Sequence, residues 1–253
     1  MAHSNLKRLL LKLIALCVLV TCLSFFTNKA SYSRLATTAP QVLTVQIESQ
    51  PQSPLQFSST KVLSSDPFSP NVEFTVTNKG GKGIRAYTIT RELVTDGGSR
   101  RAAILTHLTA QREALQPGQS KSDSVNEPHS PVSINSIILS IDFVEFVNGE
   151  TWGKDEYNSA ERLAGQRAGG HAAIEYFRQL RVKKGSSALL ETITSEEDEI
   201  VPAQGGSSEW QDGFKTGVGL VRLRLKRAKQ EGGLIRVELE LQQPFDASEG
   251  RPE

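Results

Sequence analysis

Residues 137–152 read IILSIDFVEFVNGETW: a long apolar run is followed by an Asn148-Gly149 step and an aromatic return at Trp152. Asn-Gly between apolar runs is a strong short-range signal for a β-hairpin, because both residues tolerate the backbone conformations of tight turns. We therefore expect a hairpin here. The sequence before it has a two-residue period and the sequence after it has a helical period, so we interpret it as the last hairpin of a β-sandwich.

Short alternating runs with apolar residues on one face precede this hairpin. They cover 42–49, 55–63, 72–77, 84–94 and 102–108. Proline, glycine, asparagine and aspartate separate them, and Pro117-Gly118 suits a type II turn because glycine accepts positive φ. Since no helical pattern lies between the runs to form parallel crossovers, seven or eight short antiparallel strands in a sandwich are expected over 42–155.

Two segments resemble a known fold family. VEFTVTNKG at Val72–Gly80 and LQPGQS at Leu115–Ser120 are similar to the strand-and-turn signature of immunoglobulin-like domains in exported bacterial proteins. The resemblance covers roughly 42–153 and implies the fold, but it implies no particular function. The cysteine pair and strand-buried tryptophan of antibody domains are missing.

The period changes after Asn158. Ser159 is a candidate cap for a helix from Ala160 to about Lys184, which Gly169-Gly170 should weaken or break, and 186–194 adds a short helical piece. In a second helix, Trp210, Phe214, Gly217, Val221, Leu225 and Ala228 share one face.

Gly232-Gly233 should end the second helix. Residues 234–243 alternate like a strand but have a helical composition, and we favour a helix. The expected class is thus mainly β with α. An immunoglobulin-like antiparallel sandwich at 42–155 is followed by a helical region at 156–243 and a flexible tail at 244–253.

The N-terminal segment has the positive-then-apolar order of a signal sequence or membrane anchor. Lys7, Arg8 and Lys12 precede an apolar run from Leu13 to Phe26, which is short for a helix that spans a bilayer, since spanning takes about 17–25 residues. Leu19–Cys22 resembles a lipoprotein lipobox but has Thr21 where a small residue is usual.

Three fates of this segment remain open: a retained anchor over 1–26, a cleaved signal, or lipidation at Cys22. A polar tether follows at 27–41. In each alternative the N-terminal segment either anchors the protein in the membrane or directs its export across it. Each alternative also places the body outside the cytoplasm, in the periplasm or on the cell surface.

Composition excludes several classes of function. The three cations above are the only charged residues before Phe26, so the rest of the chain carries 26 Lys and Arg against 28 Asp and Glu. This near-neutral balance gives no general attraction to nucleic acid. Both cysteines, Cys17 and Cys22, lie in the apolar run, so the body has no disulfide, cysteine metal site or thiol nucleophile.

The remaining candidate residues lie in the helical region and at the two tryptophans. A basic cluster on the second helix is a possible interaction face for an acidic partner or a membrane surface, although a solvated helix face would look the same. It consists of Lys215, Arg222, Arg224, Lys226, Arg227 and Lys229. Trp152 and Trp210 are more typical of packing than of ligand binding, and we predict that they lie at the seam between sandwich and helices.

Two G-x-x-x-G segments, Gly165–Gly169 and Gly213–Gly217, are candidates for close helix packing. The four histidines, at positions 3, 107, 129 and 171, lack the short spacing of a local metal motif, so surface or loop positions are expected for them. There is no G-x-S-x-G nucleophile motif and no complete dinucleotide fingerprint. We therefore predict no cofactor, no metal and no catalytic residue.

Gly149–Gly153 (GETWG) and Ser159–Leu163 (SAERL) resemble uncharacterised exported bacterial proteins that have a sandwich and a helical tail. We expect an envelope-tethered binding or scaffolding module that holds an envelope protein partner. The alternatives are an extracytoplasmic hydrolase, glycan-directed, with its site between sandwich and helices, and a sandwich spacer that carries an active helical segment.

Overall fold

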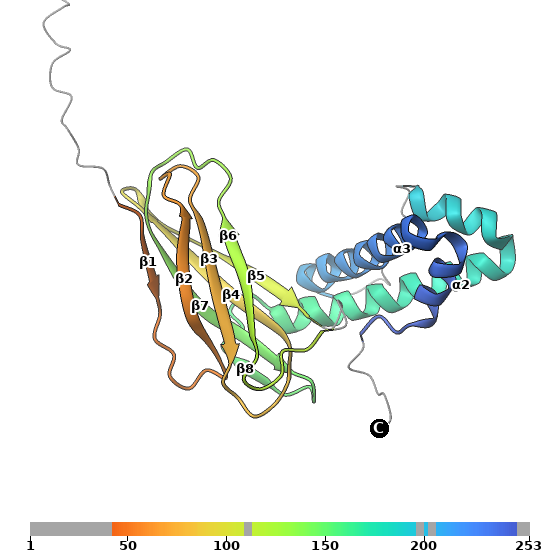
Figure 1. The fold of residues 1–253 in the computed structure, drawn as a ribbon, viewed down its shortest axis with the longest axis horizontal. Coiled ribbons are helices and arrows are strands. Elements are labelled where there is room, and N and C mark those ends of the chain that lie inside the picture. The colour runs from red at the N-terminus through yellow and green to blue at the C-terminus, as the bar shows by residue number, and fades with distance from the viewer. Residues whose placement is uncertain (1–41, 109–112, 196–199, 202–205, 247–253) are drawn as a thin grey trace, which may run out of the picture. The chain divides into compact units, whose positions relative to one another are not determined.

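A computed structural model describes residues 42–108, 113–195, 200–201 and 206–246 (Figure 1). These residues form two sheets of mainly antiparallel strands followed by two long helices, which confirms the mixed β and α class. The predicted anchor at 1–26, with Cys22, and the tether at 27–41 lie outside the described residues. In the described part of the chain, no helix is long and apolar enough to cross a membrane.

Strand β7, Ile134–Phe146, is the centre of the larger sheet. One edge of β7 pairs with β4 (Ile84–Thr95), and β4 pairs in turn with β5 (Gly98–His107). The other edge pairs with β1 (Thr44–Ile47) and β8 (Thr151–Gly153). All these pairs are antiparallel except β1 with β7, which is parallel, so the predicted purely antiparallel arrangement is wrong at this edge strand.

The smaller sheet packs face to face with the larger one. It consists of β2 (Leu55–Ser64), β3 (Asn71–Asn78) and β6 (Ser120–Asn126), in the order β2-β3-β6. Alternation along each strand turns every second side chain inward, so both sheets contribute to one core. Its fully buried members include Leu55, Phe74, Tyr87, Ile137 and Leu139.

The hairpin that follows β7 turns at the predicted Asn148-Gly149 step. The Gly149 N–H donates to the Phe146 carbonyl over 3.0 Å, and the Phe146 N–H donates to the Glu150 carbonyl over 2.9 Å. Gly149 has φ +87°. This is a three-residue loop with a glycine bulge, which is a common hairpin connection.

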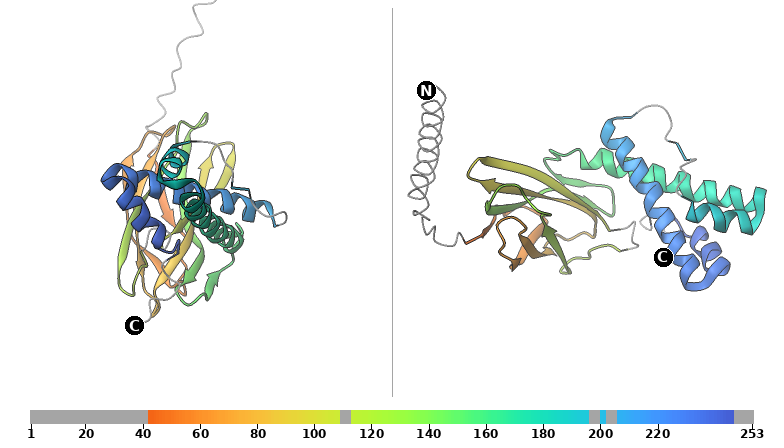
Figure 2. Two further views of the ribbon diagram at one scale, coloured as in Figure 1. Left: turned by 90° about the vertical axis from the view of Figure 1, so that its right-hand side faces the viewer. Right: turned by 90° about the horizontal axis from the view of Figure 1, so that it is seen from above.

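Both helices kink at glycine. Helix α2, Ser159–Thr194, kinks at Gly185, and helix α3, Ser208–Gln242, kinks at Gly232-Gly233 (Figure 2). The sequence predicts that the second helix ends at Gly232-Gly233, and the helical backbone is interrupted there by a kink; the helix predicted over 234–243 is confirmed apart from its last residue. The predicted weakening at Gly169-Gly170 is wrong, because the backbone is helical through both positions.

Gly169 and Gly170, together with Gly165, Gly213 and Gly217, let the backbones of the two helices come into contact. A Cβ added at four of the positions would fall 2.0 or 2.1 Å from a carbonyl oxygen of the other helix: Trp210 for Gly165, Phe214 for Gly169, Arg162 for Gly213 and Gln166 for Gly217. The residue numbers of these contacting pairs rise together along both helices. The segment of α2 before its kink and the segment of α3 before its kink therefore run parallel. The close packing predicted for the two G-x-x-x-G segments is confirmed.

The start of α2 differs from the prediction. Asn158, with φ +51°, occupies the cap position, and the Asp155 carboxylate accepts hydrogen bonds from the N–H groups of Ser159 and Ala160. The Ser159 hydroxyl instead lies 2.7 Å from the Thr88 hydroxyl on β4. Ser159 therefore connects the helix to the sheet and does not cap it.

Residues Pro244–Asp246 pack against the helices. The Phe245 ring is fully buried in the helical core, where a Cβ on Gly170 would fall 2.3 Å from it, and Asp246 is 1% exposed. The flexible tail predicted for 244–253 is therefore wrong at its start.

Candidate functional site between sandwich and helices

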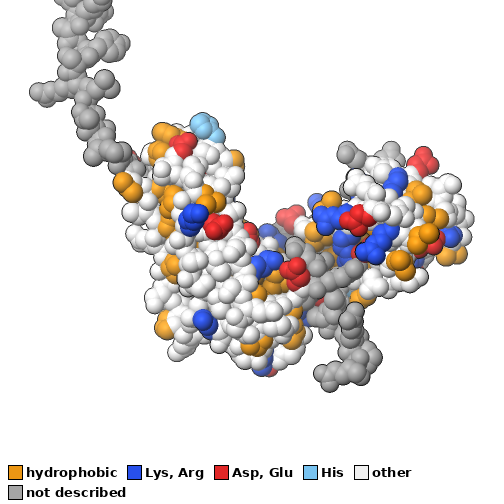
Figure 3. All heavy atoms as spheres, in the orientation of Figure 1, with side chains coloured by type: hydrophobic (Ala, Val, Ile, Leu, Met, Phe, Trp, Pro, Cys, Tyr) orange, Lys and Arg blue, Asp and Glu red, His pale blue; other side chains and the backbone are white. Residues whose placement is uncertain are grey.

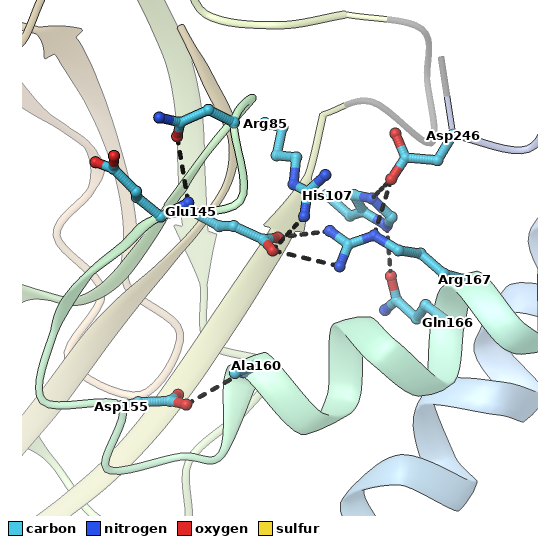
Figure 4. Close-up of polar contacts among 10 residues, drawn as sticks. Arg85, His107, Glu145, Asp155, Ala160, Gln166, Arg167 and Asp246 are labelled. Atoms are coloured by element: carbon cyan, nitrogen blue, oxygen red, sulfur yellow. Dashed lines mark hydrogen bonds and ion pairs between the residues drawn. The ribbon is translucent and has the colours of Figure 1, made fainter. Parts of the chain in front are cut away.

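A cluster of buried and half-buried polar and charged side chains joins the sandwich to the helices (Figure 4). This seam cluster consists of Arg85 of β4, His107 at the end of β5, Glu145 of β7, Gln166 and Arg167 of α2, and Asp246 after α3. Its hydrogen-bonded partners lie 22 to 139 residues apart in the sequence. Tertiary folding therefore assembles the cluster, and no local motif encodes it.

Strand alternation turns part of the cluster toward α2. Ala86 of β4 pairs with His107 of β5 on one side and with Glu145 of β7 on the other. These three residues form a row across three strands and point to the same face of the sheet. Two residues before Glu145 on β7, Phe143 shares that face and packs with Ala86 and Leu163 of α2. A small apolar contact therefore lies beside the polar one.

Glu145 is held by two arginines. Its Oε1 accepts a hydrogen bond from Arg85 Nη2 and its Oε2 accepts one from Arg167 Nη2, each over 2.5 Å. The Glu145 side chain is 9% exposed. Burial alone would raise the pKa of Glu145, but the hydrogen bonds and charges of the two guanidinium groups outweigh it, so the pKa lies below its ordinary value. In turn, Glu145 and Asp246 overcome the effect of burial on Arg167 and raise its pKa.

His107 is occupied at both ring nitrogens. Its Nδ1 lies 2.9 Å from Gln166 Oε1, and its Nε2 lies 3.4 Å from Asp246 Oδ2. Both ring nitrogens therefore have a polar partner inside the protein. Arg167 Nε donates to the same Asp246 oxygen over 2.9 Å. The side chains of His107 and Asp246 are only 4% and 1% exposed.

This geometry is suited to holding two parts of the chain together. A general base needs a free nitrogen within reach of a substrate proton, and both nitrogens of His107 already have partners inside the protein. A buried ion cluster, by contrast, fixes the relative position of the elements that supply it, because removing one member leaves another charge buried and unpaired. Here those elements are β4, β5, β7, α2 and the segment after α3.

The basic cluster predicted on α3 does not form one exposed face. Arg222 is 9% exposed and Arg224 Nε donates to Glu240 Oε1 over 2.7 Å. Lys229 Nζ donates to the Leu190 carbonyl over 2.9 Å. Lys226 is half-buried, and Arg227 is exposed. Packing of the kinked helices turns several of these side chains into internal contacts, so the five residues do not share one exposed face.

The two tryptophans lie in different cores. Trp152, opposite Val144 in the β7–β8 pair, packs against the sandwich core, and Trp210 packs in the helical core, where its ring lies 5.4 Å from that of Phe214. The apolar contact at the seam is made by Ala86, Phe143 and Leu163. The predicted seam therefore exists, but other residues form it.

The expectation of surface or loop histidines is wrong for His107. His129 and His171 are exposed, and His171 lies edge-on to the buried Phe245 ring. In the described residues, no group of three or more His, Cys, Asp or Glu side chains is placed to hold a metal ion. The sequence contains one weak signal for His107: it follows Leu105 at the strand spacing that places both on one face.

No protein-family model and no curated protein matches this chain. Among solved structures, a hypothetical protein from Peptoclostridium difficile 630 is 13% identical over 43% of this chain and 90% of its own, with a TM-score of 0.28. The putative ApaA protein from Bordetella pertussis is 10% identical over 39% and 84%, with a TM-score of 0.27.

Beta-glucosidase 3B from Thermotoga neapolitana is 16% identical over 39% of this chain and 16% of its own, with a TM-score of 0.24. At these scores the likenesses support neither a family nor an activity.

Proposed function

We propose that this protein is an envelope-tethered binding or scaffolding module, in which an immunoglobulin-like sandwich and the helical region act as one rigid body. Residues 1–26 tether it to the membrane, and the body lies outside the cytoplasm. One observation carries the proposal: the buried carboxylates of Glu145 and Asp246 are both paired with Arg167 of α2, so the seam holds the two parts together.

The alternative is an extracytoplasmic hydrolase. The His107–Asp246 pair favours it, because a carboxylate beside a histidine is typical of hydrolytic bases. Against it, the second nitrogen of His107 has Gln166 as its partner, and the side chain is nearly inaccessible. We therefore place binding first.

The test uses residues 42–253 as bait against detergent-solubilised envelope, with an unrelated envelope protein as control bait. Both described cores are built from residues 43–245, so this fragment contains what it needs to fold. We expect the same envelope proteins to be enriched in every replicate. Enrichment should fall for a Leu163→Ala bait, in which the apolar contact between the sandwich and the helices is weakened.

Two results would count against the proposal. One is the recovery of no reproducible partner. The other is hydrolysis of glycan fragments by the wild-type protein that His107→Asn abolishes while its circular dichroism spectrum stays unchanged. Mass spectrometry of the mature N-terminus, extracted from membranes, tests the tether separately and distinguishes a retained anchor from cleavage and from lipidation at Cys22.

A further inference from the structure

The end of the helical region away from the sandwich brings two kinked helices together (Figure 1). Arg178 Nε of α2 donates to the Leu241 carbonyl over 2.8 Å, and Arg181 Nε donates to Glu238 Oε1 over 2.6 Å. The numbers rise along α2 as they fall along α3, so the two segments are antiparallel. Val182–Lys184 follow Arg181 on α2 and Ile235–Val237 precede Glu238 on α3, so both segments adjoin this ion pair. We call 182–184 and 235–239 the helical tip.

The helical tip exposes aliphatic side chains. Val182 is 84% exposed, Ile235 is 74% exposed and Leu239 is 47% exposed. Ile235 and Leu239 lie one helical turn apart and therefore share a face. On the inner side of the same segment, Val237 and Leu241 are buried in the helical core. Residues 235–241 are thus apolar on both the buried and the exposed side, whereas a surface helix is usually polar on its exposed side.

Cations surround these apolar side chains. Lys183, Lys184 and Arg236 are exposed, and Lys184 and Arg236 have no ion-pair partner among the described residues. The acid within the tip, Glu238, is neutralised by Arg181. Figure 3 shows basic and apolar side chains side by side on the visible face of the helical region. The tip therefore combines net positive charge with exposed aliphatic groups.

We propose that the helical tip docks on an anionic lipid surface. Lipid phosphates complement the lysines and Arg236, while the boundary between headgroups and acyl chains takes up Val182, Ile235 and Leu239. The proposal rests on the envelope tether proposed above, which keeps a bilayer within reach of the tip. It differs from the predicted interaction face, because it uses the exposed residues at the kinks and not Arg222, Arg224 or Lys229.

The experiment is co-sedimentation of residues 42–253 with vesicles of phosphatidylglycerol and phosphatidylcholine in equal parts, with pure phosphatidylcholine vesicles for comparison. We expect binding to the anionic vesicles that weakens as salt is raised, because salt screens exposed charges. Removing one cation should weaken binding about fivefold. Lys184→Gln with Arg236→Gln should therefore weaken it by at least about tenfold.

A second variant tests the apolar part. Ile235→Ser with Leu239→Ser should also lose at least about tenfold in vesicle binding, because the removed side chains no longer enter the interface. Val132→Ser, a matched change at a similarly exposed aliphatic residue of the sandwich, should bind like the wild type. Circular dichroism and the unfolding midpoint confirm that each variant is folded.

The proposal is overturned if the wild-type fragment does not sediment with anionic vesicles, or if both tip variants bind like the wild type. It is also overturned if the fragment is a dimer that Ile235→Ser with Leu239→Ser converts to a monomer, since a second copy would then cover the tip. A reproducible protein partner without vesicle binding would reject the lipid surface and keep the proposed function. Vesicle binding without a reproducible protein partner would support the lipid surface and count against the proposed function.

Discussion

Glu145 shows at the scale of one residue why the seam is held by charge. Its carboxylate is shared between Arg85 of the sheet and Arg167 of the helix, and it is nearly inaccessible to water. Burying an ion is costly, and a buried pair offsets that cost only when every charge has a partner. The side chain that balances two guanidinium groups is therefore the one whose loss should matter most.

We expect Glu145→Gln to lower the free energy of unfolding by about 3 kcal/mol, because it removes the buried carboxylate that Arg85 and Arg167 share. Denaturant unfolding at neutral pH measures this. The control is Glu150→Gln, which removes the anion of an exposed pair with Lys82 and should leave the midpoint unchanged. Equal effects of the two changes would contradict the role given to Glu145.

The pH dependence of Glu145 has a definite sign. Its pKa is lowered in the folded state, so the charge stabilises the fold above the ordinary glutamate pKa, and this contribution is lost as the pH falls through the lowered value. Between about pH 5 and pH 3, wild-type stability should therefore fall more steeply than that of Glu145→Gln. Parallel curves would show that Glu145 is not held as a carboxylate.

Tyr87 provides a second pH effect, at high pH. Burial in the sandwich core raises the pKa of Tyr87 to about 12. In the unfolded chain the phenol ionises near pH 10, so stability should fall by about 2–3 kcal/mol as the pH rises from about 10 to 12. Tyr87→Phe should flatten this part of the curve, and denaturant unfolding at several pH values measures the difference.

At the scale of elements, glycine has opposite effects at different positions of the same helices. A glycine pair normally weakens a helix, and Gly232-Gly233 does interrupt α3. Gly169-Gly170 does not interrupt α2, because α3 and Phe245 pack directly on the missing side chains. The close approach of the two backbones compensates for the lower helix propensity of glycine, and only the partner helix distinguishes the two cases.

We predict that Gly169→Ala destabilises the helical region by about 3 kcal/mol, because its methyl group would meet the Phe214 carbonyl oxygen and force the helices apart. Gly219→Ala is the matched control within α3. A Cβ there has no neighbour within 4 Å, so the higher helix propensity of alanine should stabilise by about 0.5–1 kcal/mol. Thermal unfolding followed by circular dichroism distinguishes the expected destabilisation by Gly169→Ala from the expected stabilisation by Gly219→Ala.

At the scale of the whole molecule, the seam decides whether sandwich and helices move together. Leu163 is fully buried between Ala86 and Phe143, and the polar seam cluster lies beside this contact. Trp152, which the sequence suggested for this position, is half-buried and packs against the sandwich core instead. Truncating these two side chains should therefore weaken different parts of the protein.

We expect Leu163→Ala to cost about 3 kcal/mol and to make the α2–α3 region sensitive to protease at lower denaturant than the sandwich. Trp152→Ala should destabilise the sandwich and leave the connection to the helices intact. Limited proteolysis with mass spectrometry identifies which part is cut first. Release of the helical region by Trp152→Ala alone would restore the original assignment of the seam.

The sequence by itself determined the local structure, and the reason is that its signals are local. Alternation over two residues, the Asn148-Gly149 turn, the change of period after Asn158 and the kink at Gly232-Gly233 each depend on neighbours in the chain. These signals predicted the two sheets, the last hairpin and the two helices.

Only the tertiary structure decided what joins them. His107, Glu145, Arg167 and Asp246 have no common motif, because the contacts that define them join residues up to 139 positions apart, from the larger sheet and from the helical region. The parallel pairing of β1, the inward turn of Arg222 and the burial of Phe245 have the same origin. In each case the packing partner is distant in the sequence, so the local pattern could not predict the pairing or the burial. Burial depends on the partner as much as on the residue.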